Sequence, residues 1–531
     1  MQTTRPKRFT TRMAAALLLG ALLMIAGCSP KAATPVVIVE PALTGETAVE
    51  GFILNSNLST HLVSPDGSYF LAVRNDGYGS YLGVFPSDLP DQETLQEIPV
   101  ESVDREWLLT SWFSYEPLGW ISDTEFVYAK LGWQPSGGHK NERGVVLVVA
   151  RLDRDSGTVS AEESAFFELP YMDSVVRTLF LPERNQVYLN NNTTIWRFDI
   201  AQRELTVLKS GLPDYIYRQP IPSPDGNYYV YELNEQGKHG LFIFDTTTLE
   251  ERPLMLNGDT MSFYPAWSYD GKYIAAYTVR RKEGATGTAW HDYRLFVGED
   301  TALSIGTSIT VVDTQGNLVA NIEIEGKYVQ DFIWSHNDHA LGFVASIEPE
   351  PETGAGADEG FYRPTVCESV WIARVGNGSE DKPPVHLGGI PKIGDDELPP
   401  HIAPVTFDAK SEGIYCHLVR DGIWYFSEDA EPVRLVGGLW PGMEAQTPLV
   451  YGDSIVALID VGENQCEFYL FDGGNATKFG EAGSFWTWII AHTGDKLILY
   501  RGVTGSGAPA EYWPYPETGR LAVYNMIKPE D

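Results

Sequence analysis

The feature that most constrains this chain is a short turn motif that recurs along it. Residues 64–67 and 223–226 both read Ser-Pro-Asp-Gly, residues 268–271 read Ser-Tyr-Asp-Gly, and residues 335–338 read Ser-His-Asn-Asp. Each copy is followed by a run that holds residues favoured in strands, such as Tyr, Val, Ile or Phe. Glycine accepts a positive φ and aspartate bonds to nearby backbone, so the motif predicts a tight turn that leads into a strand.

A second motif, an apolar residue followed by aspartate, closes a later strand-like run. Asp199 and Asp245 are 46 residues apart, and the turn residues Asp225 and Asp270 are 45 apart. The next copies of the two motifs lie 68 and 67 residues further on, which predicts an insertion of about 22 residues near 280–304. The five copies are Leu152-Asp153, Phe198-Asp199, Phe244-Asp245, Val312-Asp313 and Phe471-Asp472.

Four strands in about 45 residues, with a turn signature, are typical of a propeller blade. We therefore predict an all-β fold, a β-propeller of four-stranded blades that is closed by the N-terminal run Val49–Leu54. A nine-bladed ring lies beyond the usual range of about 4 to 8, so we expect one segment to be an insertion or a split blade. We predict eight blades, with seven as the alternative; a pair of β-sandwiches would not explain the paired spacings. The segments are 59–98, 107–170, 175–210, 218–257, 262–326, 328–389, 401–437, 445–480 and 485–526.

The turn pattern, Ser-Pro-Asp-Gly followed by Lys, Asn or Ser and then Tyr, resembles the TolB-like (WD-type) propeller repeat. It is clear at four sites and weaker near 119–123, 407–409 and 450–453. The resemblance implies protein–protein work at the cell envelope, although the motif specifies a fold and no activity. Related repeats occur in prolyl oligopeptidases, where an α/β-hydrolase domain follows. Here the repeats run to about residue 526, and a Gly-x-Ser-x-Gly elbow is absent, which argues against that peptidase chemistry.

The N-terminus predicts export. Four basic residues between Arg5 and Arg12 precede the uncharged run Met13–Ala26, which is too short to span a bilayer but fits a signal peptide. The run ends in Ile-Ala-Gly-Cys28, which resembles the lipobox of bacterial lipoproteins; the alternative is an ordinary secretory signal. The resemblance implies that Cys28 carries the lipid and that residues 1–27 are removed.

This interpretation divides the chain into three parts and gives it a location. Residues 1–27 are the signal peptide, residues 28–48 a lipidated flexible tether, and residues 49–531 a single propeller domain. The protein would be held on the bacterial membrane by acyl chains, facing the periplasm or the cell exterior. No other run is apolar enough for a membrane span.

The net charge of the chain limits the kinds of partner that it can bind. The formal net charge is −34, and removal of a signal that holds four basic and no acidic residues would make it −38. Nucleic acids and anionic lipid surfaces need clustered Lys and Arg, so both are disfavoured as partners. We expect the membrane to be contacted through acyl chains on Cys28, and an envelope protein or an extracellular ligand to be the other partner.

The sequence identifies no catalytic residue, metal ligand or cofactor, and the binding residues stay unknown. Residues 153–157 imitate the start of a calcium loop but lack its later ligands, and His336 and His339 lie in a blade turn, so we interpret both as turn residues. Cys416 and Cys466 could pair, but we expect these thiols and that of Cys367 to be buried and reduced.

Two further sets of residues are predicted to be structural. The acidic stretch 348–360 and the Pro-rich stretch 390–404 are predicted to be solvated loops or connections. Most of the clustered aromatic residues are expected to pack between blades, although exposed ones would suit peptide or glycan binding. They are Trp107, Trp112, Phe113, Tyr115, Trp120 and Trp133 in the second segment, and Trp486, Trp488 and Trp513 in the last.

The functional prediction is a non-catalytic protein–protein or ligand interaction module at the bacterial cell envelope. The first alternative is an extracellular hydrolase or lyase that acts on glycans or peptides through carboxylates at the propeller channel. The second is an envelope sensor of solutes or glycans. Convergent carboxylates at the channel would favour an enzyme, and an apolar patch on one face would favour a partner site.

Overall fold

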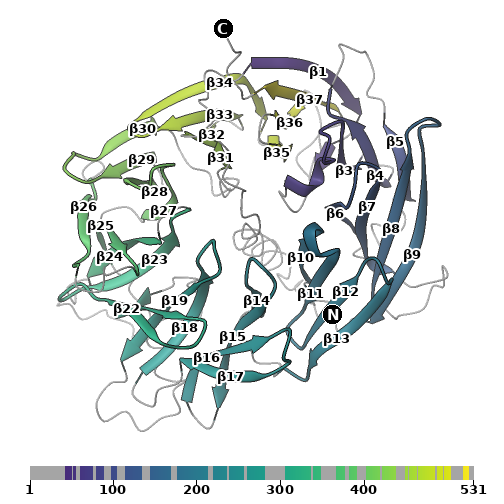
Figure 1. Cartoon of the computed structure of the whole chain (residues 1–531). Helices are drawn as coiled ribbons and strands as arrows, with labels where there is room; N and C mark the ends of the chain where they lie inside the picture. The colour runs from purple at the N-terminus through teal and green to yellow at the C-terminus, as the bar shows by residue number, and fades with distance from the viewer. Residues whose placement is uncertain are drawn as a thin grey trace, which may run out of the picture.

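The computed structural model shows a ring of antiparallel four-stranded sheets (Figure 1), in which the first strand of each sheet lies nearest the centre and the fourth at the rim. An all-β propeller is thereby confirmed. The residues described are 42–50, 52–54, 60–75, 79–88, 97–104, 114–133, 144–168, 176–212, 219–235, 238–255, 260–280, 305–336, 339–347, 366–376, 382–391, 402–418, 421–437, 449–451, 454–462, 465–484, 487–493, 496–503 and 518–525.

The first three blades carry the two short 3-10 helices, η1 (Thr60–Leu62) and η2 (Pro182–Arg184). Blade 1 holds β2 (Phe52–Leu54), β3 (Tyr69–Asn75), β4 (Gly79–Pro86) and β5 (Ile98–Asp104). Blade 2 holds β6 (Ser114–Trp120), β7 (Glu125–Trp133), β8 (Gly144–Asp153) and β9 (Thr158–Glu168). Blade 3 holds β10 (Arg177–Leu181), β11 (Gln186–Asn190), β12 (Thr194–Asp199) and β13 (Glu204–Ser210).

The middle three blades include the one five-stranded sheet of the described residues. Blade 4 holds β14 (Ile221–Pro222), β15 (Tyr228–Glu235), β16 (Lys238–Asp245) and β17 (Glu251–Met255). Blade 5 holds β18 (Thr260–Trp267), β19 (Tyr273–Arg280), β21 (Ser308–Asp313) and β22 (Leu318–Ile322). Blade 6 holds β20 (Ile305–Gly306), β23 (Tyr328–Trp334), β24 (Ala340–Ile347), β25 (Val366–Arg374) and β26 (Val385–Gly389).

The last three blades include blade 9, which combines strands from both ends of the chain. Blade 7 holds β27 (Ile402–Phe407), β28 (Gly413–Leu418), β29 (Gly422–Ser427) and β30 (Val433–Gly437). Blade 8 holds β31 (Leu449–Tyr451), β32 (Ser454–Gly462), β33 (Gln465–Asp472) and β34 (Asn475–Ser484). Blade 9 holds β35 (Thr487–His492), β36 (Lys496–Val503), β37 (Thr518–Asn525) and β1 (Ala42–Glu50).

The predicted blade number is wrong. The described residues form nine sheets, one in each of the nine segments, so neither eight nor seven is correct. No segment is an insertion, because each of them contributes to a sheet of its own. The first sheet also needs β2, which precedes its segment, and β5, which extends beyond it, and the last sheet takes β1 from the N-terminal part of the chain. The expectation of eight came from the usual range of blade numbers and not from the residues.

The ring is closed by an N-terminal strand, but by a different one from that predicted. β1 pairs with β37 in the register Ala42↔Asn525 to Glu50↔Thr518. Residues 52–54 of the predicted run instead form β2, the first strand of blade 1. The apolar run suits a strand near the ring centre, whereas the polar sequence Ala-Leu-Thr-Gly-Glu-Thr-Ala-Val-Glu suits an outermost strand. The first described strand, β1, thus lies partly inside the stretch 28–48 that was predicted to be a tether.

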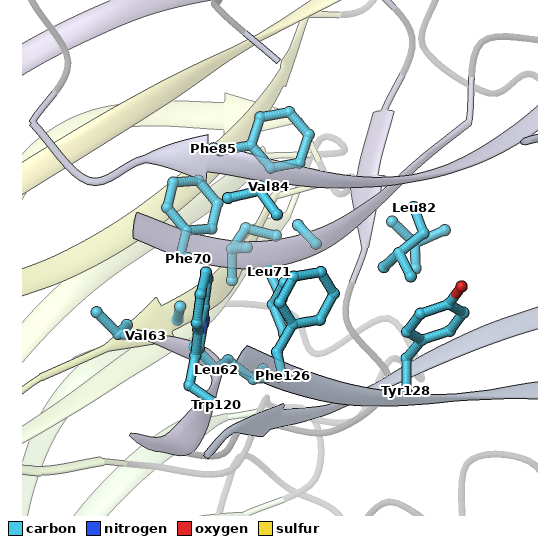
Figure 2. Close-up of a cluster of buried hydrophobic side chains, with 14 of the residues drawn as sticks. Leu62, Val63, Phe70, Leu71, Leu82, Val84, Phe85, Trp120, Phe126 and Tyr128 are labelled. Carbon is cyan, nitrogen blue, oxygen red and sulfur yellow. The ribbon is translucent and has the colours of Figure 1, made fainter. Parts of the chain in front are cut away.

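The core lies between neighbouring blades, since each sheet buries both of its faces. On β15, Tyr229 and Tyr231 pack toward blade 3, while the alternate residue Val230 belongs to the cluster shared with blade 5. Figure 2 shows part of the cluster that joins blades 1 and 2, to which Phe70 and Leu71 of β3 and Phe126 of β7 belong. Burial on both sides explains why strands such as β8 read as almost continuous apolar runs.

Candidate functional site

The turn motifs form one face of the ring, which we call the turn face. It carries the connections from first to second and from third to fourth strands. In blade 4 the Ser223 hydroxyl donates to Asp225 Oδ1 at 2.6 Å, and the Tyr228 backbone N–H donates to Ser223 Oγ at 2.9 Å. The same two bonds recur at residues 64–69 and 268–273. The predicted turns are therefore confirmed as structural elements.

The aspartates of the second motif hold the other turns of this face. Asp245 Oδ1 accepts hydrogen bonds from the backbone N–H groups of Thr247 and Thr248, at 2.8 and 2.9 Å. Asp153 Oδ1 likewise accepts from the backbone N–H groups at 155 and 156. The segment that imitates a calcium loop is thus a turn.

The turn face is also tied from blade to blade. Arg154 of blade 2 donates to Asp66 Oδ2 of blade 1 at 2.6 Å, and this bond holds the pKa of Asp66 well below its usual range. His339 Nε2 of blade 6 lies 2.8 Å from Asp270 Oδ2 of blade 5. His336 lies instead against Tyr269 and 3.1 Å from Thr406 Oγ1 of blade 7. The two histidine rings therefore have different hydrogen-bond partners and do not point toward a shared site.

Three tryptophans at the ends of first strands reinforce these links. The indole N–H groups of Trp120, Trp267 and Trp334 donate to backbone carbonyls of the preceding blade, each at 3.1 Å. The acceptors are the carbonyls of Leu62, Ile221 and Ala266. Repetition of one bond in three blades marks it as part of the architecture.

The other residues singled out from the sequence are either buried in the core or lie outside the described residues. Cys367, Cys416 and Cys466 are buried free thiols. Tyr115 and Trp120 are buried between blades 1 and 2, as expected of packing residues. Outside the described residues lie Cys28, the acidic stretch 348–360, Trp107, Trp112, Phe113, Trp486 and Trp513, while Trp133 and Trp488 are placed only as strand residues of β7 and β35.

The opposite face, which we call the loop face, carries connections of very unequal length. It joins second to third strands, and each blade to the next. Only residues 236–237 separate β15 from β16, whereas residues 281–307 separate β19 from β21. Long, variable connections on a rigid scaffold are where binding residues concentrate. A binding site is therefore expected on the loop face.

The junction of blades 5 and 6 is where the repeat is broken. Before the chain enters β21 of blade 5, residues 305 and 306 form β20, which pairs with β23 of blade 6 at Ile305↔Gln330 and Gly306↔Val329. This fifth strand lies on the inner side of blade 6. The insertion predicted near 280–304 thus ends in a strand that ties two blades together.

A pocket of about 710 Å³ opens at this junction. One wall is Thr307, which directly follows β20 and donates through its hydroxyl to the Thr278 carbonyl at 2.9 Å. The other wall is the connection from β22 to β23, residues 323–328. The volume falls within the range of small-molecule sites. Its lining residues are Thr307, Glu323, Ile324, Glu325, Gly326, Lys327 and Tyr328.

A chain of polar side chains crosses blade 5 and ends at this pocket. The Thr278 hydroxyl donates to Thr310 at 2.8 Å, and Thr310 donates to Asn321 Oδ1 at 3.2 Å. Asn321 Nδ2 then donates to Glu323 Oε1 at 2.8 Å. At the inner end, Ser262 lies 3.2 Å from Thr278. Because a hydroxyl has one hydrogen and Thr278 has already donated its own, Ser262 is the donor there.

This polar chain therefore has one direction, from the first strand of blade 5 to a carboxylate of the pocket. Hydrogen bonds in such a chain polarise and strengthen one another. Its last donor fixes the carboxylate of Glu323, although that residue is exposed. The pocket thus holds at least one carboxylate whose position is set by the blade beneath it.

The one cation among the lining residues is already neutralised. Lys327 Nζ lies 2.7 Å from Glu368 Oε2 and 5.9 Å from the centre of the Trp371 ring, both on β25. Neither partner belongs to the pocket lining. The two carboxyl residues among the described lining are Glu323 and Glu325.

Two buried carboxyl groups have raised pKa values. Burial raises the pKa of Glu116 on β6 to about 7, even though the Thr178 hydroxyl donates to its Oε1 at 2.8 Å. Burial also raises the pKa of Asp331 on β23 to about 7. Asp331 sits in a bulge at φ +50°, a conformation that costs energy in a non-glycine residue. Acids with such pKa values suit proton transfer near neutral pH.

Within the described ranges, no group of three or more His, Cys, Asp and Glu side chains is placed to hold a metal ion. No helix in the same ranges is long and apolar enough to cross a membrane.

Known proteins with a similarity to this chain are found among solved structures alone. No family model matches the chain, and no curated protein does. Among solved structures, a prolyl endopeptidase is similar at 10% identity and TM-score 0.39 over 85% of this chain and 55% of that chain. An oligogalacturonate lyase from Vibrio parahaemolyticus is similar at 9% and 0.35, over 80% and 98%. TolB from Acinetobacter baumannii is similar at 10% and 0.26, over 78% and 80%.

This chain spans about half the length of the prolyl endopeptidase. All three TM-scores lie below 0.5, so no activity passes from these proteins to this chain.

Proposed function

We propose that this chain is a non-catalytic interaction module of the bacterial cell envelope, anchored by a lipid on Cys28, which binds its partner or ligand on the loop face. The observation that carries the proposal is the pocket at the junction of blades 5 and 6. It lies where the extra strand β20 breaks the repeat, whereas the turn motifs are occupied by bonds within and between blades. A site on one face of a ring leaves the rest of the ring as scaffold.

The choice of face is tested by two crosslinking positions at opposite ends of the same strand. Gln315 precedes β22 on the turn face and Glu325 follows it on the loop face, and both side chains are exposed. A photo-reactive residue at position 325 is expected to capture a specific partner in native envelopes, and one at position 315 is not. Capture from position 315 alone, or equal capture from both, would reject the loop face as the binding face.

The anchor is tested separately. Cys28→Ala removes the thiol that the lipobox resemblance assigns to the lipid. We expect the variant to leave the membrane fraction, because a single polypeptide without acyl chains has no other predicted membrane contact. If the variant still fractionates with membranes, the lipid anchor on Cys28 is wrong.

The catalytic alternative, a hydrolase or lyase of glycans or peptides, has one observation in its favour. Glu116 and Asp331 have pKa values raised to about 7 by burial, as a general acid needs. Turnover of an extracellular glycan or peptide that is abolished by Glu116→Gln or Asp331→Asn would establish this alternative. Turnover that survives both substitutions would remove these carboxyls as its basis.

A further inference from the structure

The N-terminal strand determines which face of the ring lies toward the membrane. We propose that the turn face is directed at the anchoring membrane and that the loop face, with its pocket, is directed away from it. The loop face then fits a partner that approaches from the aqueous compartment, and not one embedded in the same bilayer. This inference rests on the proposed function, from which it takes the lipid on Cys28 and the loop face as the binding face.

The first observation is the place where the chain enters the ring. β1 is the outermost strand of blade 9 and lies at the rim (Figure 1). It begins at Ala42, which is opposite Asn525, the last residue of the third strand β37. The turn face carries the connections that follow third strands, so Asn525 and Ala42 both lie on that face. The other end of β1, Glu50, lies on the loop face, from which the chain passes to β2 of blade 1.

The second observation is how firmly this entry point is held. Backbone pairing with β37 extends from one end of β1 to the other. In the middle of β1, the Glu46 carboxylate accepts hydrogen bonds from Arg501 of β36 and, at 2.8 Å, from Arg520 of β37. One side chain thus ties β1 to two other strands of its sheet, and charge-assisted bonds of this kind are stronger than neutral ones. The chain therefore enters the ring at a fixed point of the turn face.

The third observation is the length of chain between the lipid and the strand. Cys28 precedes Ala42 by fourteen residues, and a chain of that length spans at most about 50 Å when it is fully extended. β1 has 9 residues, which makes it about 30 Å long. If the loop face lay against the membrane, the connecting chain would have to run back along the blade for about 30 Å before it reached the lipid. With the turn face toward the membrane, it needs no such detour.

The test measures energy transfer from a donor dye on the acylated full chain to an acceptor lipid in phosphatidylcholine vesicles. The dye is attached at exposed positions on the turn face, Gln315→Cys or Asn475→Cys, or on the loop face, Glu325→Cys or Gln465→Cys. The three native thiols of the described residues are buried. We expect the distance from dye to lipid to be shorter by about 25 Å on the turn face, the length of an 8-residue strand such as β33.

Matched variants separate the entry point from the lipid. Cys28→Ala with a histidine tag in place of residues 1–27, held on nickel-chelating lipid, still leaves the ring at Ala42 and should give the same order of distances. The same substitution with the tag moved between residues 236 and 237, on the loop face between β15 and β16, should reverse the order. A Gly/Ser insertion of about 20 residues between residues 34 and 35 should reduce the difference between the faces, because a longer tether restricts the ring less.

Several results would overturn the inference. They are shorter distances from the loop face, equal distances from the two faces, and distances that differ between blades 5 and 8 but not between faces, as for a ring that stands on its edge. If one of these occurs while position 325 still captures a partner, the proposed function stands and only the orientation is wrong. If the turn face lies nearer the lipid while position 325 captures nothing, the orientation stands and the partner-binding function is wrong.

Discussion

The two faces of this ring are built on opposite principles. On the turn face, polar side chains make hydrogen bonds within the turns and to the next blade. They include the hydroxyls of Ser223 and Ser268 and the carboxylates of Asp225 and Asp270. On the loop face, connection lengths vary widely, and a carboxylate fixed by the blade beneath it borders an open pocket. The contrast teaches that polar residues in a repeat motif stabilise the scaffold, whereas departures from the repeat mark the place to look for binding.

The largest effect that this comparison predicts is on the turn face. Trp267→Ala should cost about 3–5 kcal/mol of stability, because it empties a site between blades 4 and 5 and removes the bond to the Ile221 carbonyl. Trp267→Phe should cost about 1–3 kcal/mol, since it keeps an aromatic ring but leaves that carbonyl without its donor. Thermal unfolding midpoints measure both. Unfolding midpoints equal to that of the wild type would show that Trp267 and its hydrogen bond do not stabilise the fold.

The second effect depends on pH. Burial raises the pKa of Glu116 from its ordinary 4.5 to about 7, so the folded protein holds this proton more tightly than the unfolded chain. The fold should therefore lose stability as the pH rises from about 4.5 to 7, by roughly 3 kcal/mol in all. Below this window the contribution is fully present, and above it the loss is complete.

Glu116→Gln removes this titration while keeping an acceptor for the Thr178 hydroxyl. We expect the variant to be more stable than wild type at about pH 8 and to show a smaller change in unfolding midpoint between about pH 5 and pH 8. The same pH profile in both proteins would show that Glu116 is not the titrating group.

The smallest predicted effect compares the loss of one carboxylate charge on each face. Asp270→Asn on the turn face removes a charge that bonds His339, and should cost about 0.5–1 kcal/mol, since the pair is partly exposed and screened by solvent. Glu325→Gln on the loop face removes an exposed charge and should change stability by less than about 0.5 kcal/mol. Equal losses would erase the distinction between a structural and a binding face.

Much of the scaffold could be predicted because its chemistry is local. Within each turn motif, Ser223 and Asp225 bond to groups at most five residues away, so the sequence alone indicates the turn. The predicted segments fall close to the observed blades for the same reason, although the first, 59–98, leaves out β2 and most of β5. The blade number was wrong because the sequence did not rule out any of the nine segments and only the usual size of propellers did.

The pocket at the junction of blades 5 and 6 could not be predicted from local sequence patterns. The spacing of Asp245 and Asp313 located the insertion, but nothing in Ile305-Gly306 indicates that these residues pair with Val329 and Gln330 of the next blade. The polar chain likewise needs Thr278, Thr310 and Asn321 to lie close together on three neighbouring strands, which the sequence pattern alone does not reveal. Glu323 and Glu325 were two acids among 72 until the fold placed them at a pocket.

The closing sheet has a consequence for the order in which the ring is made. β1 is the first described strand of the chain and β37 the last, and the Thr44 hydroxyl donates to the Val523 carbonyl across 479 residues of sequence. A ribosome finishes β1 long before its pairing partner exists. Contacts so distant in sequence form late, after loop-closure entropy has been overcome. Until the ninth blade is complete, residues 42–50 have an exposed, unpaired edge, which makes them the segment of the ring most in need of protection during synthesis and folding.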